Sequence, residues 1–354
     1  MSNAAQTESP GSAVPRAAPA AVPPHAQLIR IGVSIWASRA VYAAAKLKLA
    51  DHIGDGSKSS ADLAKATETH EPALYRLMRA LASLGVLTEV KPRHFALTTL
   101  GAALKSGAPG AARATIMTLA GDWQWQAWNE FHHSLKTGKS GVEKAHGAQL
   151  FQFLGSHPQE AADFGEAMVG RHGHQPPVIA AAYDFAQFDT LVDVGGGTGN
   201  LLTTILGASP NLKGVLYELP HVIPEAKKRI AEHKLENRCM LVAGDFFKDV
   251  PSGRDGYLLS HILHDWQDAE SIAILRKIRQ AMDPKGKLLI VEMVLPPGDA
   301  PHEGKILDLL MLTVTGGVER TAEEFGQILS AAGFKLSRVV TTATEQCIVE
   351  AVPV

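Results

Sequence analysis

The carboxyl-terminal half of the chain alternates short apolar runs with segments whose apolar residues recur at helical spacing. The apolar runs predict strands at 190–194, 214–218, 239–243, 256–260, 287–294, 335–341 and 346–351. Between the first five, the helical spacing predicts helices at about 199–208, 221–234 and 266–282. Such alternation is typical of a mostly parallel sheet with helices on both faces. The pattern therefore predicts an α/β unit of the doubly wound class.

The amino-terminal half is predicted to be helical. Residues 27–54 are apolar on more than one helical face, which is typical of a buried helix or of one packed against a second subunit. A helix from Ser60, a second from Pro72 to Leu84 and a small hairpin from Val86 to Leu97 follow in the order of a winged-helix unit. Further helical segments rich in Trp and Phe fill residues 112–178.

Charge and composition disfavour several partners. The 354 residues carry 34 Lys plus Arg against 36 Asp plus Glu, and the second helix of the winged-helix outline offers only Arg76 and Arg79 to phosphates, so nucleic acid is not expected. Two distant cysteines, Cys239 and Cys347, fit a reducing compartment and predict a cytoplasmic protein. No apolar run reaches the roughly 18 residues of a membrane span, so no membrane partner is expected. Residues 1–25, rich in Ala and Pro, are expected to be a disordered tail.

A glycine-rich turn follows the first predicted strand. In "DVGGGTG", Asp193 precedes four glycines within five positions, and this entropic cost indicates that a ligand approaches the main chain closely. The turn leads into a predicted helix, whose free N–H groups and dipole favour a nucleotide-type cofactor. The dinucleotide fingerprint G-x-G-x-x-G requires glycine at position 200, where Asn200 stands, and this disfavours a nicotinamide cofactor.

Two further strand ends carry carboxylates. Glu218 ends the second predicted strand, where an acid can accept hydrogen bonds from both ribose hydroxyls; the alternative is an exposed acid at a helix start. Asp245 and Phe246 follow the third strand, where an adenine amine and ring can lie, although Phe246 by itself also fits an ordinary core position.

The fourth predicted strand ends in two histidines. His261 and His264 follow Ser260, over the crevice where ligands bind in such sheets. The His-x-x-His spacing suggests a metal, but no third ligand stands nearby in the sequence, so no metal is expected. A base titrating near 6.5 can take the proton of a phenol, whose pKa is near 10. His264 is therefore predicted to be a general base.

Five motifs together resemble a known family. "DVGGGTG", "LPHV", "GDFF", "HILHDW" and "GGVERTAEEF" stand in this order behind a helical amino-terminal half. This arrangement is similar to the plant caffeate-type and bacterial small-molecule O-methyltransferases, which are metal-independent and use S-adenosylmethionine (SAM). The resemblance covers about residues 27–353. It implies a Rossmann-like SAM-methyltransferase sheet with an amino-terminal, all-helical, winged-helix-like dimerisation domain, and hence a homodimer.

With this resemblance the chain is expected to have four parts. These are a disordered tail at 1–25, a winged-helix-like dimerisation domain at 26–105, a helical linker and substrate-pocket segment at 106–180, and a Rossmann-like SAM-binding catalytic domain at 181–354.

The resemblance also implies roles for individual residues. The base is His264, flanked by Glu292 and Glu319. Glu292 ends the fifth strand, where a carboxylate can orient the imidazole and favour its charged form. Glu319 precedes a T-x-x-E capping box that begins at Thr321, so a helix-start role is its alternative.

SAM contacts are expected at the glycine turn, at three strand ends and at one helical arginine. The residues are Asp193, Gly195, Gly197, Glu218, Asp245, Phe246, Ser260 and Arg171. Plant members commonly have Asp where Glu218 stands and Lys where Ser260 stands, so the arm is longer at the first position and a cation is missing at the second. Arg171 is expected to pair with the methionyl carboxylate of SAM, with a surface position as the alternative.

The expected acceptor is a small hydroxylated aromatic or polyketide-like molecule in a flat apolar slot. Candidate lining residues are Trp123, Trp128, Phe151, Met168, Leu307 and Met311, with polar contacts from His172, His174 and His261. Each apolar candidate also fits a core position. The alternatives are a winged-helix regulator that senses SAM without turnover, a nicotinamide dehydrogenase, and a SAM-scaffold enzyme with other chemistry. The charge balance counts against the regulator, and Asn200 counts against the dehydrogenase. The presence of His264 with its two glutamates counts against other chemistry on the SAM scaffold.

Overall fold

The computed structural model describes residues 22–110 and 112–354. Most of the predicted tail, residues 1–21, lies outside this part of the chain, and the first helix already begins at Pro24.

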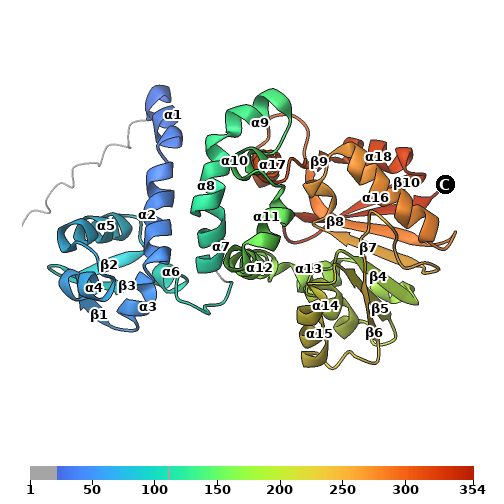
Figure 1. The fold of residues 1–354 in the computed structure, drawn as a ribbon, viewed down its shortest axis with the longest axis horizontal. Coiled ribbons are helices and arrows are strands. Elements are labelled where there is room, and N and C mark those ends of the chain that lie inside the picture. The colour runs from blue at the N-terminus through green and yellow to red at the C-terminus, as the bar shows by residue number, and fades with distance from the viewer. Residues whose placement is uncertain (1–21, 111) are drawn as a thin grey trace, which may run out of the picture.

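The amino-terminal elements form a helical unit around a small sheet, drawn in blue and cyan in Figure 1. They are α1 (Pro24–Gly32), α2 (Ile35–Lys46), α3 (Leu49–Ile53), β1 (Ser57–Ser59), α4 (Ser60–Ala66), α5 (Glu71–Ser83), β2 (Leu87–Lys91), β3 (His94–Leu97) and α6 (Thr99–Ala102). The two predicted helices and the hairpin are confirmed as α4, α5 and β2–β3. The unit is mainly helical as predicted, and the short strand β1, which the sequence pattern does not predict, joins the hairpin in an antiparallel sheet of order β1-β3-β2.

The sequence explains where α4 begins and which residues form the core of this unit. The Ser59 hydroxyl accepts the Asp62 N–H and so starts α4. Leu63, Met78 and Phe95 are fully buried and join α4, α5 and the hairpin in one core.

An apolar face on α1 and α2 is exposed among the described residues. Leu28, Ile29, Ile31 and Trp36 are 60–72% exposed. Beside them, a groove of about 400 Å³ lies between α2 and α7, lined mainly by Ala37, Val41, Ile116, Leu119 and Ala120. Contiguous exposed apolar surface of this kind is typical of a protein interface.

A helical layer connects the two ends of the molecule (Figure 1). It contains α7 (Ala112–Leu119), α8 (Asp122–Asn129), α9 (Phe131–Thr137), α10 (Gly141–His146), α11 (Leu150–Ser156), α12 (Pro158–His172) and α13 (Gln175–Ala182). Its core, which includes Ala127, Val142 and Phe153, also takes in Val314 of α17 (Glu303–Val314). The layer therefore packs directly on the carboxyl-terminal domain.

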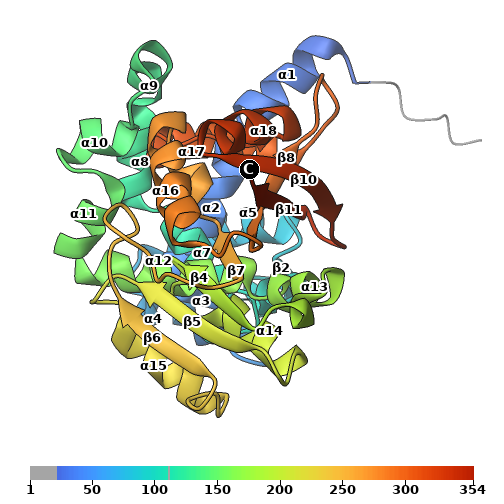
Figure 2. The ribbon, with the colours of Figure 1, turned by 90° about the vertical axis from the view of Figure 1, so that its right-hand side faces the viewer.

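The carboxyl-terminal domain is built on a mixed sheet (Figure 2). Its strands are β4 (Thr190–Val194), β5 (Lys213–Glu218), β6 (Cys239–Ala243), β7 (Gly256–Ser260), β8 (Lys287–Leu295), β10 (Phe334–Thr341) and β11 (Gln346–Pro353). They lie in the order β10-β11-β8-β7-β4-β5-β6, and β9 (Arg320–Thr321) pairs with β8. The strands β4 to β8 are parallel, whereas β11 runs antiparallel to β8 and to β10.

Helices cover both faces of this sheet, as the alternating pattern predicts. The principal ones are α14 (Asn200–Ala208), α15 (Ile223–Glu232), α16 (Asp268–Ala281) and α18 (Ala322–Ala331). Neighbouring residues of β4 face opposite cores, since Val192 packs with the α16 and α18 side and Leu191 with the α14 side. The strand order reverses at β4, so the crevice at its carboxyl end is the expected ligand site. Within the described residues, no helix is long and apolar enough to cross a membrane.

Candidate active site

The glycine turn is open at Gly197 and closely packed at Gly195. Gly195, Gly197 and Gly199 all have positive φ, at 72°, 57° and 84°. A Cβ built on Gly197 would meet nothing within 4 Å, whereas one on Gly195 would lie 2.6 Å from Ile262. The Gly197 N–H donates to Glu218 Oε2 at 2.9 Å. The main chain at Gly197 is therefore bare toward the crevice and tied to the carboxylate at the end of β5.

The carboxylates around this turn keep capacity to accept hydrogen bonds. Asp193 is 1% exposed, and its Oδ1 has no partner among the described residues. Burial, and then the charge of Glu218, raise the pKa of Asp193 to about 7. A pair of carboxylates beside a bare glycine fits a ligand that brings hydroxyl or amino donors, as the ribose and adenine of SAM do. The residues present therefore fit this cofactor.

The remaining predicted cofactor residues lie at neighbouring strand ends or on α12. Asp245 Oδ1 accepts the Phe247 N–H, and the partly buried Phe246 packs against Trp266 and the main core. Ser260 ends β7 half-buried. Arg171 lies in the last turn of α12 and forms an ion pair with Glu303 at 3.1 Å, so the structure gives its guanidinium a protein partner. A role for Arg171 at the methionyl carboxylate stays a prediction.

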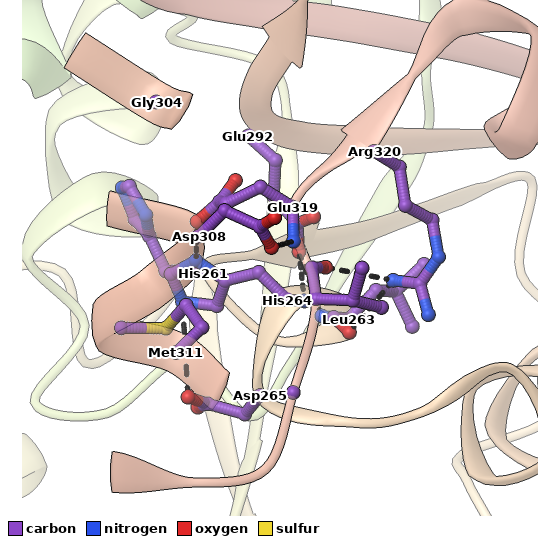
Figure 3. Close-up of polar contacts among 12 residues, drawn as sticks. His261, Leu263, His264, Asp265, Glu292, Gly304, Asp308, Met311, Glu319 and Arg320 are labelled. Atoms are coloured by element: carbon purple, nitrogen blue, oxygen red, sulfur yellow. Dashed lines mark hydrogen bonds and ion pairs between the residues drawn. The ribbon is translucent and has the colours of Figure 1, made fainter. Parts of the chain in front are cut away.

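His264 lies in a short 3-10 turn, Leu263–Asp265, directly above β7 (Figure 3). Its Nδ1 is 2.7 Å from Glu319 Oε1. An ionised carboxylate only accepts, so Nδ1 carries a proton and donates it, which leaves Nε2 as the atom that can accept a proton. The helix-start alternative for Glu319 fails, because the capping box is formed by Thr321 and Glu324 alone.

Three carboxylates set the proton affinity of this imidazole. Burial lowers the pKa of His264, but the charges of Asp265, Glu319 and Glu292 outweigh burial and raise it to about 10. Asp265 Oδ1 lies 4.0 Å from Nε2. The sequence-based expectation of titration near 6.5 is therefore corrected, because the neighbouring Asp265 acts on this ring together with Glu292 and Glu319, which come from elements far apart in the chain.

Glu292 contacts the turn and not the ring. Its Oε1 accepts the backbone N–H groups of Ile262, Leu263 and His264 at 3.1, 2.6 and 3.2 Å. His261 stands in the left-handed region at φ 54° and Ile262 in the right-handed one, a combination that points successive N–H groups at one anion. The predicted orientation of the imidazole by Glu292 is thus wrong in detail, since Glu319 fixes the ring and Glu292 fixes the backbone beneath it.

His261 forms a small polar cluster with two residues from the helical layer. Gln175 Oε1 lies 3.1 Å from His261 Nε2 and 3.1 Å from His172 Nδ1, and the two rings lie 4.0 Å apart. Burial lowers the pKa of His172 to about 4 and that of His261 well below its ordinary value, so both rings are neutral. In the described part of the chain, no three His, Cys, Asp or Glu side chains are grouped as metal ligands.

The predicted acceptor residues separate into two groups. Met311, 9% exposed on α17, lies beside His264 and Asp265 in Figure 3, and Phe151 stacks on Trp266 at 6.5 Å. Trp123 packs on Phe153 and Trp128 on Phe131 within the helical layer. Met168 and Leu307 are half-buried on α12 and α17.

Sequence reasoning missed four residues around the base: Asp265, Asp308, Gln175 and Arg320. Asp308 Oδ1 accepts the Glu319 N–H at 2.8 Å, and the buried Arg320 contacts the turn from below. The two residues next to known motif positions, Asp265 and Arg320, could have been found by their adjacency to His264 and Glu319. Gln175 and Asp308 carry no such signal.

Comparison with known proteins points in one direction. A family model described as an O-methyltransferase domain matches residues 128–335, and one described as an O-methyltransferase dimerisation domain matches residues 31–106. A phenazine O-methyltransferase of Lysobacter antibioticus is 43% identical over 94% of this chain and 98% of its own length. A mitomycin biosynthesis 6-O-methyltransferase of Streptomyces lavendulae is 35% identical over 86% and 87%.

Solved structures agree with the sequence matches. An O-methyltransferase from neocarzinostatin biosynthesis, in complex with SAM and 2-hydroxy-5-methyl naphthoic acid, is 33% identical, with a TM-score of 0.83 over 92% of this chain and 98% of the other. Relatives also include proteins with other names, such as an aclacinomycin 10-hydroxylase of Streptomyces purpurascens, which is 33% identical over 86% of this chain and 83% of its own length.

Proposed function

The chain belongs to the SAM-dependent O-methyltransferase family, and from this membership we propose that it methylates a hydroxyl of a small aromatic or polyketide-like natural product, with His264 as general base. The observation that carries the proposal is the 2.7 Å contact between His264 Nδ1 and Glu319, which leaves Nε2 free to accept a proton over the crevice beside the glycine turn.

The cofactor is SAM, and in this proposal the turn from Asp193 to Gly197 holds it together with Glu218, Asp245, Phe246 and Ser260. When bound, SAM supplies a methyl group on a sulfonium, so that the bond to the acceptor oxygen forms as the carbon–sulfur bond breaks. Glu218 Oε1 and Oε2 are held by the N–H groups of Leu219 and Gly197, which fixes the carboxylate for hydroxyl donors. Phe246 offers a ring edge beside the turn.

His264 receives the acceptor's proton at Nε2 in this mechanism. The carboxylates of Glu319, Asp265 and Glu292 stabilise the imidazolium that results. A pKa of about 10 is close to the roughly 10 of a phenol, so the proton passes between oxygen and nitrogen with little change in free energy. The same raised pKa means that kcat/KM should rise with pH well above neutrality.

Acceptor size and assembly follow from the same elements. Met311 and His261 stand next to the base, and Met168, Phe151, Trp123 and Trp128 are proposed to form the remaining walls. One relative is named for a phenazine and another was solved with 2-hydroxy-5-methyl naphthoic acid, and aromatic molecules of this kind suit such walls. The exposed apolar face of α1 and α2 extends into the matched dimerisation domain, which begins at residue 31, so a homodimer is proposed.

The direct test is a panel of hydroxylated aromatics incubated with the protein and methyl-labelled SAM, read by mass spectrometry. Transfer of label to oxygen in one acceptor class, lost in His264→Ala, is the expected result. SAM binding without any methylated product would favour the second candidate, a SAM-scaffold enzyme with other chemistry, as the hydroxylase name of one relative suggests.

A further inference from the structure

Arg320 is a buried charge with an unusually complete set of partners. It begins β9, which pairs with the end of β8, and its side chain is 1% exposed. Nη1 donates to the Leu263 carbonyl at 3.0 Å and Nη2 to the Trp266 carbonyl at 3.0 Å. Nε and Nη2 also donate to Asp268 Oδ1 at 3.1 and 2.9 Å. A buried guanidinium is tolerated only when its donors are satisfied, so this geometry is tightly specified.

The two carbonyls that accept from Arg320 at 3.0 Å lie at the turn that carries His264. Leu263 and Trp266 stand on either side of His264 and Asp265, so the planar guanidinium bridges the two ends of the turn. Figure 3 shows the Leu263 end of this bridge beside Arg320. The carbonyl between them, that of His264, accepts the Val318 N–H at 2.9 Å. A Cβ on Gly317 would lie 2.0 Å from this same carbonyl oxygen, which shows how closely the segment before Arg320 packs on the turn.

The turn is therefore held from two sides. Glu292 of β8 accepts its N–H groups, and Arg320 of β9 donates to its carbonyls, and these two strands are paired in register. The adjacent residues Glu319 and Arg320 have different partners. Glu319 forms a hydrogen bond with the imidazole of His264, and Arg320 forms one with the backbone carbonyl of Leu263.

We propose that Arg320 is a positioning residue for the base: its guanidinium holds the His264 turn so that Nδ1 stays on Glu319 and Nε2 stays aimed at the acceptor oxygen. This inference rests on the proposed role of His264. Because the side chain is 1% exposed, it acts through the turn and not through direct contact with a ligand.

The test is Arg320→Lys in the full-length protein. A lysine ammonium cannot bridge two carbonyls and a carboxylate in one plane. We expect kcat to fall by about 10²-fold, as for a misplacement of about 1 Å. The dissociation constant for S-adenosylhomocysteine, measured by calorimetry, should stay within about twofold, because a misplaced base leaves the cofactor site intact. The ascending limb of kcat/KM against pH should move to lower pH as the imidazole loosens from Glu319.

Arg238→Lys is the matched control. Arg238 also donates to three backbone carbonyls, those of Leu206, Ser209 and Leu212, but these lie on the α14 side of the sheet. This variant should lower the melting temperature and leave kcat and the pH limb unchanged. If Arg320→Lys does not fold, Asp268→Asn provides a milder variant. Asp268 is 68% exposed, and its loss leaves the guanidinium with one charge partner fewer, so a severalfold lower kcat is expected.

Two results would overturn the inference. One is a folded Arg320→Lys protein with wild-type kcat and an unmoved pH limb. The other is a loss of S-adenosylhomocysteine affinity in proportion to the loss of kcat, which indicates a general structural role. His264→Ala is measured in the same assay. If it keeps full activity, the proposed function of His264 has failed; if it is slow while Arg320→Lys is fast, only the positioning role has failed.

Discussion

The carboxylate of Glu319 should control the pH at which the enzyme becomes active, and Glu319→Gln tests this. Glutamine keeps an oxygen that can accept the Nδ1–H of His264 at the present 2.7 Å, so the ring and its tautomer are preserved. The Asp308 contact to the backbone N–H at residue 319 is also unaffected. The variant differs from the wild type in one respect: it lacks the buried negative charge of Glu319.

The size of the effect follows from the pKa of His264. Its rise from 6.5 to about 10 corresponds to about 5 kcal/mol in favour of the imidazolium, at about 1.4 kcal/mol for each tenfold change. Asp265 and Glu292 remain in the variant and carry part of this preference. An opposite charge at hydrogen-bond distance typically shifts a pKa by about 1 to 3, so the pKa of His264 should fall by that amount. Because the free base then forms at lower pH, the ascending limb of kcat/KM moves toward acid.

The assay is product formation from labelled SAM at saturating cofactor, with kcat/KM measured from about pH 6 to pH 10.5. The plateau rate should also fall, because proton transfer from the acceptor hydroxyl to a less basic imidazole is less favourable in free energy. Glu324→Gln is the control, since Glu324 belongs to the capping box and does not contact His264. A limb that stays in place or moves to higher pH in Glu319→Gln would refute the electrostatic reasoning.

Three other outcomes are expected. His264→Ala should keep the calorimetric affinity for SAM and lose about 10²-fold or more in turnover, and equal losses of both would contradict a role as base. Gly197→Ala should weaken S-adenosylhomocysteine binding at least about tenfold. The new Cβ would meet no protein atom within 4 Å, so it enters the crevice where the cofactor is proposed to lie, and the positive φ adds a strain of about 1–2 kcal/mol. The equally open Gly138→Ala, with φ 69°, imposes the same strain without the binding loss, so similar affinities in the two variants would remove the turn from the cofactor site. Trp36→Asp, at a side chain 72% exposed on α2, should shift a dimer to monomer in analytical ultracentrifugation, and an unchanged dimer would place the interface elsewhere.

The sheet could be predicted from the sequence because its signals are local. The strands at 190–194, 239–243 and 256–260 have the predicted bounds, since each is an apolar run ended by glycine, polar residues or a turn. The strands β1 and β9 were missed because they have three and two residues, too few for a periodic pattern, and exist through pairing with β3 and β8.

The identity of the site residues could also be predicted from the sequence, but the contacts that these residues make could not. His264 and Glu319 are brought together as the motifs suggest. Glu292 has a different partner from the predicted one, because its contact depends on the left-handed backbone of His261, which no residue type at that position announces. Arg171 has an ion pair with Glu303, which lies 132 positions further along the chain.

These misses share a physical cause that bears on the chemistry. A general base needs a defined proton affinity and a defined position, and here charges supply the first and hydrogen bonds to the backbone supply the second. The charges of Asp265, Glu319 and Glu292 set the proton affinity of His264. Because a charge acts over several ångströms, any nearby carboxylate contributes, and a sequence motif can identify such a carboxylate. Position depends on hydrogen bonds between Glu292 or Arg320 and backbone groups, which any amino acid in the turn offers equally. Changes at Glu319 should therefore move the pH profile with little loss of geometry, whereas changes at Arg320 should lower the rate first and move the profile only as a consequence.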